Sequence, residues 1–178
     1  MNKKILLMTE TAFMLALLIT LQWATKAFGQ MITGSCVNGV LTITVLLVGL
    51  PGGLAVAVLS PVFAFSLGIA PNVLTVPAIM VGNSIYVLLL HFLYKRVPGV
   101  KIVAVGLAAV GKFTALFTLV NWVVCDLAAQ PLMETGLLKA PMLIQLPTSF
   151  GIVQLFTALI GGAVGALLCE SLRKALHR

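Results

Sequence analysis

The sequence predicts an all-α, polytopic membrane protein with six transmembrane helices and both termini in the cytoplasm. Three observations predict it: the composition, the separation of long apolar runs by short charged clusters, and the positions of the basic residues. Of the 178 residues, 61% are hydrophobic and 8% are charged, whereas a soluble domain carries about 25% charged and about 45–50% apolar residues. A transmembrane barrel would show short alternating segments, which we do not find. We expect a single six-helix domain over residues 1–178.

Six apolar stretches approach the roughly 20 residues that a helix needs to cross a bilayer. We place the spans at about 5–23, 36–50, 53–69, 72–94, 101–125 and 146–171. Proline and glycine mark tight turns after the second and third spans, and a basic turn separates the fourth from the fifth. The longer connections are 24–35 and 126–145. The first stretch is too long for a signal peptide and has no small-residue cleavage site after it, so we expect it to remain as a span.

The basic residues predict the orientation of these spans. With both termini inside, most basic residues are cytoplasmic, namely Lys3, Lys4, Lys95, Arg96, Lys101, Arg173, Lys174 and Arg178. Lys26 and Lys139 alone fall outside, which is the asymmetry of the positive-inside rule. Because the cations flank spans, the net charge of +7 indicates membrane orientation and not a nucleic-acid partner.

Residue patterns typical of enzymes are scarce. The two histidines, His91 and His177, have no carboxylate at metal-ligand spacing. The surroundings of Ser149 lack the first glycine of a nucleophile elbow. Gly111 and Lys112 lack both the earlier glycine and the following Ser or Thr of a phosphate-binding loop. We therefore expect no catalytic residue, no metal and no cofactor, and any energy for transport must come from an ion gradient or a partner.

Cysteine and glycine positions favour structural roles. Cys36, Cys125 and Cys169 show no CxxC spacing, so we expect small buried residues, with a Cys36–Cys125 disulfide left open. Small residues recur four apart in the sixth span and predict close helix packing. They are Gly161, Gly162, Gly165 and Ala166.

Polar residues inside spans are the most informative feature, because such residues are expensive in hydrocarbon and usually face a protein interior or a partner. Lys112 lies near the middle of the fifth predicted span. Two interpretations stay open for it. In one, the ammonium lies at the floor of a ligand pocket. In the other, the span begins later and the lysine reaches the inner interface.

Other polar residues lie at comparable positions. Asn83 and Lys112 lie at similar depth when counted from the outer ends of antiparallel helices, and Gln154 lies somewhat higher. We expect these helices to bring the three side chains to one cavity in the outer half. A second polar stripe follows Lys112 at helical spacing, and either a site or interhelical hydrogen bonds would explain it. It comprises Thr114, Thr118 and Asn121, beside Trp122.

The first span carries Ala12 and Ala16, an A-x-x-x-A pattern close to the basic N-terminus. With the chain length, the six spans and the segments 58–65, 76–77 and 82–83, this pattern resembles the substrate-binding S component of an energy-coupling factor (ECF) transporter. That resemblance implies a multi-pass protein of a prokaryotic plasma membrane. It would capture a water-soluble vitamin and pair with a transmembrane coupling subunit and two cytoplasmic ATPases.

The resemblance also implies roles for particular residues. Ala12 and Ala16 would dock the coupling subunit, and residues 24–35 would form a lid over the ligand. The implied ligand contacts are Phe28, Gln30, Asn83, Lys112, Asn121, Trp122 and Gln154. A lone cation with amide partners suits a carboxylated molecule, with pantothenate or a similar vitamin acid as the leading candidate.

Two other functions remain as alternatives. A stand-alone secondary transporter or channel would call for an acidic residue within the membrane, but all four acids lie toward span ends. A membrane enzyme or assembly factor would call for a cluster of catalytic side chains. The four acids are Glu10, Asp126, Glu134 and Glu170.

Overall fold

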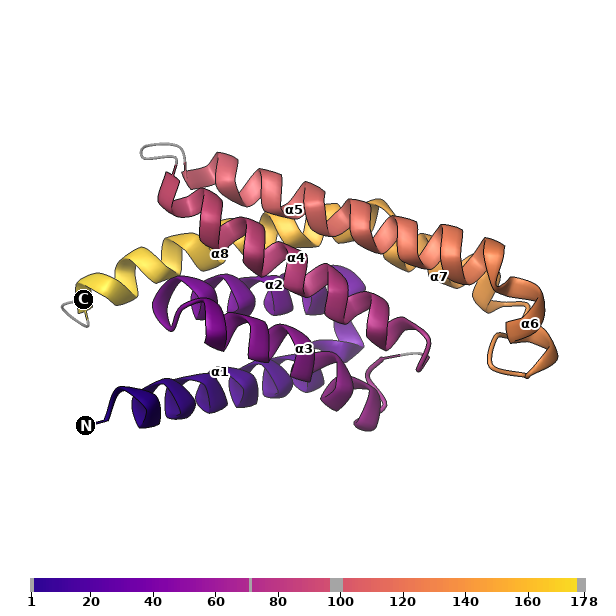
Figure 1. Cartoon of the computed structure of the whole chain (residues 1–178), viewed down its shortest axis with the longest axis horizontal. Coiled ribbons are helices and arrows are strands. Elements are labelled where there is room, and N and C mark those ends of the chain that lie inside the picture. The colour runs from indigo at the N-terminus through magenta and orange to yellow at the C-terminus, as the bar shows by residue number, and fades with distance from the viewer. Residues whose placement is uncertain (1, 71, 97–100, 176–178) are drawn as a thin grey trace.

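The computed structural model describes residues 2–70, 72–96 and 101–175, with only the backbone for 95 and 96. Within these residues the chain is helical, without strands (Figure 1). In order, the elements are α1 (Lys3–Thr25), a 3-10 turn η1 (Lys26–Phe28), α2 (Gln30–Leu47), α3 (Leu50–Ser66), α4 (Thr75–Arg96), α5 (Lys101–Phe117), a π-helix η2 (Thr118–Leu127), α6 (Ala129–Glu134), α7 (Met142–Phe150) and α8 (Ile152–Ala175).

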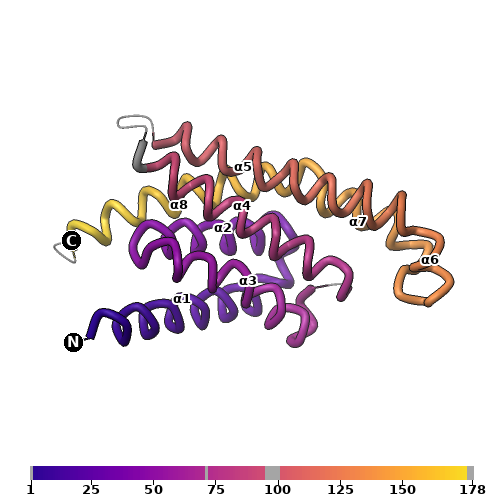
Figure 2. Tube along the Cα trace, viewed as in Figure 1, coloured from indigo at the N-terminus to yellow at the C-terminus, as the bar shows by residue number. Residues whose placement is uncertain are grey.

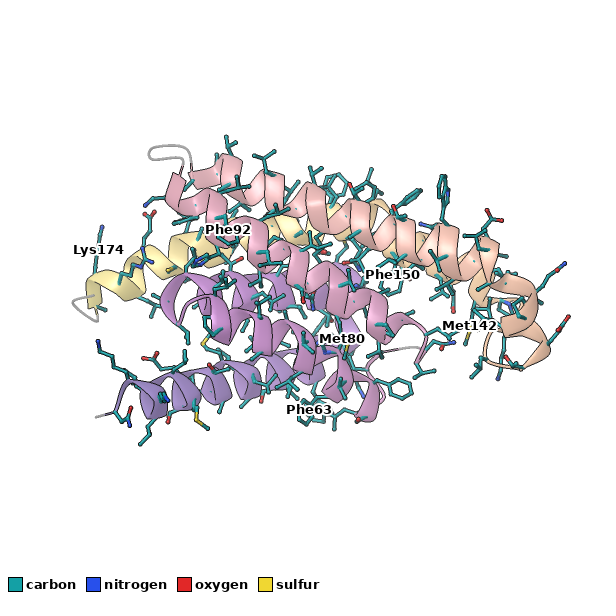
Figure 3. All side chains as sticks on the ribbon, viewed as in Figure 1. Phe63, Met80, Phe92, Met142, Phe150 and Lys174 are labelled. Atoms are coloured by element: carbon teal, nitrogen blue, oxygen red, sulfur yellow. The ribbon has the colours of Figure 1, made fainter. Side chains whose placement is uncertain are left out.

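Five helical segments of the described chain are long and apolar enough to cross a membrane. They are Lys3–Phe28, Gln30–Leu47, Thr75–Tyr94, Lys101–Leu127 and Met142–Ala175, and α3 is a shorter apolar helix of 17 residues. Large apolar side chains project outward from the bundle, among them Phe63 on α3 and Phe92 on α4 (Figure 3). The fold class is therefore an all-helical, membrane-embedded bundle.

Two predicted boundaries are wrong. Residues 24–35 do not form a loop, because α1 continues to Thr25 and α2 begins at Gln30. The chain turns between them at Gly29, whose φ of +84° favours glycine. The sixth predicted span is also broken, since α7 ends at Phe150 and α8 begins after Gly151. Counting apolar residues misplaced the start of α2 because its first turns carry the polar residues Gln30, Thr33 and Ser35.

The helices run roughly along the long axis of the molecule (Figures 1 and 2). α1 begins and α8 ends at the same end of the bundle, where the α2–α3 turn also lies. α6 lies at the opposite end, beyond the ends of α1 and α3 along the long axis. The main core is buried among α1, α2, α3, α4, α5 and α8, and it includes Leu18, Leu41, Tyr86 and Val105. A smaller apolar cluster packs η2 against α7 near α6.

Glycines allow α2 and α8 to approach closely, as the small-residue pattern predicted. A Cβ placed on Gly165 would lie 2.6 Å from the carbonyl oxygen of Gly39, and one on Gly161 would lie 2.9 Å from the Cβ of Asn38. The three cysteines are free thiols, so the disulfide left open between Cys36 and Cys125 is not formed in this structure.

Candidate functional site

A pocket lies inside the bundle where α1, α2, α3, α4, α5, α7 and α8 converge. The cavity has a volume of about 90 Å³, several times the volume that one water molecule needs. Its polar lining is drawn from six helices and includes Gln22, Asn38, Ser60, Asn83, Lys112 and Gln154. Gln30 also lines it and is exposed, so the pocket reaches the surface near η1.

Lys112 is the charged group of this pocket, and its side chain is only 3% exposed. Its Nζ donates hydrogen bonds to Oδ1 of Asn38 at 2.6 Å and to Oδ1 of Asn83 at 2.7 Å. The ammonium also lies 5.8 Å from the ring centroid of Tyr86, within the range of a cation–π contact. Lys112 therefore lines the pocket, as one of its two interpretations expects.

The described contacts of Lys112 are neutral, so a protonated Lys112 has no counter-charge among them. The pocket's described lining residues include no aspartate or glutamate. An ammonium has three N–H donors, and the two amide oxygens account for two of them. An anionic group entering the pocket would find both a positive charge and an unused donor.

Three polar atoms of the lining are buried without a hydrogen-bond partner. They are Oε1 of Gln22, Oγ of Ser60 and Nδ2 of Asn83. The orientation of the Asn83 amide follows from chemistry: lysine only donates, so Oδ1 must face Lys112 and Nδ2 remains free. Buried polar groups are nearly always partnered. Three exceptions around one cavity indicate a place for bound molecules that supply the missing hydrogen bonds.

Asn38 is a site residue that the sequence prediction missed. It is fully buried on α2, and its Nδ2 donates to the carbonyl oxygen of Gly34 at 2.8 Å and to Oγ1 of Thr157 at 3.4 Å. These bonds aim Oδ1 at Lys112. The rule that flagged Asn83 would also have flagged Asn38, but the predicted span began at residue 36 and so placed Asn38 at a helix end.

The predicted ligand contacts divide into two groups. The structure brings Asn83, Lys112, Gln154 and Gln30 to the pocket. Nε2 of Gln154 donates to the carbonyl oxygen of Ser149 across the α7–α8 break, at 3.2 Å. Phe28 is 67% exposed and does not line the pocket. The expected lid is thus a helical turn in which Gln30 alone, of the two proposed contacts, reaches the site.

The polar stripe on α5 and η2 faces away from the pocket, so that part of the site prediction is wrong. Lys112, Leu116 and Val120 form the buried face, which turns Thr114 and Thr118 outward. Trp122 is 66% exposed. The amide of Asn121 is buried without a partner in the π-helix, but it is not among the residues that line the pocket.

The two alanines of the first span lie on the outer surface of α1. Ala12 and Ala16 are exposed, whereas Met14 and Leu18 point into the core. The alanine face of α1 is therefore available to another helix in the membrane.

The fold and the site together define a membrane-embedded helical protein with a buried, positively charged pocket. In comparisons with known proteins, no family model, no curated protein and no solved structure matches the chain. The function must therefore be argued from the pocket and from the surface of the bundle.

Proposed function

We propose that this protein is the substrate-specific membrane subunit of an ECF-type importer, and that it captures a small carboxylated vitamin or related micronutrient. One observation carries the proposal. The Lys112 side chain is buried in the pocket, with neutral partners and, when protonated, an unused donor. Such a group suits a carboxylate, which accepts charge-assisted hydrogen bonds worth about 1.5–3 kcal/mol.

The other lining residues restrict the chemical groups that the proposed ligand would carry. Gln22 and Ser60 offer unpartnered polar atoms that suit hydroxyl or amide groups of the solute. Phe150 is the aromatic side chain that the described residues contribute to the lining, which gives little surface for stacking a flat ring. A compact acid with hydroxyl and amide groups fits this lining, and pantothenate is the leading candidate.

The outer surface supports a partnership with a coupling subunit and two cytoplasmic ATPases. The exposed alanine face of α1 permits close approach of a partner helix. The proposed topology has six spans, which are the five long helical segments and the shorter α3. Both termini lie in the cytoplasm of a prokaryotic cell. The start of α1 and the end of α8 lie at the same end of the bundle, which supports this topology. Energy would come from the ATPases, since none of the described lining residues is an acid that could couple an ion gradient.

Replacement of Lys112 by methionine tests the proposal, because it keeps the length of the side chain and removes its charge. Titration calorimetry with pantothenate should show roughly tenfold to hundredfold weaker binding, at about 1.4 kcal/mol per tenfold. Lys139→Met, at an exposed lysine, is the matched control and should bind normally. Equal affinity in a folded Lys112→Met protein would remove Lys112 from the site.

A further inference from the structure

We propose that, when no organic solute is bound, the pocket holds a small inorganic anion such as chloride between Nζ of Lys112 and Nδ2 of Asn83. The anion would be a resident ligand of the empty transporter subunit. This proposal goes beyond the capture of an organic solute and does not depend on its identity.

The first step of the argument concerns charge. Nζ of Lys112 is bound by two amide oxygens and faces an aromatic ring, so its buried partners are all neutral. A water molecule could satisfy the free N–H of Asn83, but it would leave the buried positive charge without a counter-charge. A buried lysine without a counter-charge tends to lose its proton, so a bound anion would also favour the protonated form. A mobile anion supplies the pairing that the described lining residues do not.

The second step concerns geometry. Nζ of Lys112 lies 2.7 Å from Oδ1 of Asn83, and the bonds of an amide group are about 1.2–1.3 Å long. The two donors therefore lie at most about 5 Å apart, given those bond lengths. One ion held by both donors at ordinary hydrogen-bond distances of about 3 Å can span that separation.

The third step concerns space and access. The volume of about 90 Å³ admits an ion together with water. Exposed Gln30 at the rim gives a route from the surface. Gln22 and Ser60, on the other walls, have unpartnered oxygen atoms that can accept from the ion's remaining waters.

The resident anion has one consequence that rests on the proposed function. A carboxylated solute must displace it, so chloride acts as a competitor. Chloride at ten times its own dissociation constant should weaken the apparent affinity for the solute about elevenfold, by simple mass action.

Thermal unfolding of the purified, solute-free protein tests the site directly, in a series of sodium chloride concentrations. Chloride at about 100 times its dissociation constant should raise the Tm by about 5–10 °C. Lys112→Met and Asn83→Asp should both abolish the shift. The aspartate keeps the hydrogen bond to Lys112 and supplies a negative charge in place of the anion. It also lacks the Nδ2 donor. Lys139→Met should keep the full shift.

A Tm that does not rise with chloride, or an undiminished chloride shift in Lys112→Met, would overturn the proposal. A shift lost in Lys112→Met but retained in Asn83→Asp would overturn the role of Asn83. Because the assay contains no organic solute, a failure of pantothenate to bind leaves its outcome unaffected.

Discussion

Single glycines set how closely α2 and α8 approach, and therefore where Asn38 lies. A Cβ on Gly161 would meet the carbonyl oxygen of Ser35 and the backbone nitrogen of Gly39. Backbone atoms cannot move aside as a flexible side chain can, so the two helices would have to separate. Asn38, which holds Lys112 from α2, would move with its helix.

Gly161→Ala should therefore destabilise the protein by about 1–3 kcal/mol, the usual cost of overpacking, and should weaken binding in the pocket. Chemical or thermal unfolding in detergent would measure the loss. Gly106→Ala is the matched control, because a Cβ there meets nothing within 4 Å. It should be neutral or stabilising through the helix propensity of alanine. Equal effects of the two variants would contradict the close-packing account.

At the residue scale, the sequence could identify Lys112 and Asn83, because a polar side chain in the middle of an apolar span needs a reason. It could not identify which residues face the pocket. Trp122 and Phe28 are contacts that the family resemblance implied, yet both side chains lie on the outside. The direction in which a side chain points depends on how the helices pack, which a single sequence does not reveal.

At the element scale, α1 differs from its neighbours. It packs against α2 and α3 along one side and exposes the other, where Ala12 and Ala16 lie. Near its C-terminal end, α1 also contributes Gln22 to the pocket lining. One helix thus carries both the proposed docking face, at Ala12 and Ala16, and a pocket residue, Gln22, nearer its C-terminal end.

Ala12→Trp and Ala16→Trp should block the approach of a coupling helix, because close packing in membranes requires small residues. Uptake by cells that express the whole transporter should fall, while pantothenate binding to the purified subunit should be unchanged. Val164→Trp, at an exposed position of α8, controls for a bulky residue at the membrane surface. Normal uptake in both alanine variants would mean that the coupling subunit docks elsewhere.

Helix boundaries show a second limit of prediction at this scale. The apolar pattern located the five long apolar segments and the shorter α3, but it placed the start of α2 six residues late. Gln30 and Thr33 looked like loop residues although they line the pocket from within a helix. Polar residues that line a pocket interrupt the apolar pattern from which a membrane helix is predicted.

At the scale of the whole molecule, the two ends of the bundle differ in chemistry. The end where α8 finishes carries basic residues, and there Nζ of Lys101 pairs with Oε1 of Glu170 at 2.5 Å and Arg173 donates to the carbonyl oxygen of Leu46. These contacts join α5, α8 and α2 at that end. The pocket reaches the surface away from that end, near Gln30. This polarity suits capture of a solute on the outer side and coupling on the inner side.

Mass spectrometry of the solute retained through mild detergent purification tests the central claim most directly. The wild-type protein and Lys139→Met should each retain one small carboxylated molecule per chain, and Lys112→Met should retain little or none. A solute without a carboxylate, or the same amount of solute in the wild-type and Lys112→Met proteins, would contradict the proposal that Lys112 captures a carboxylated ligand.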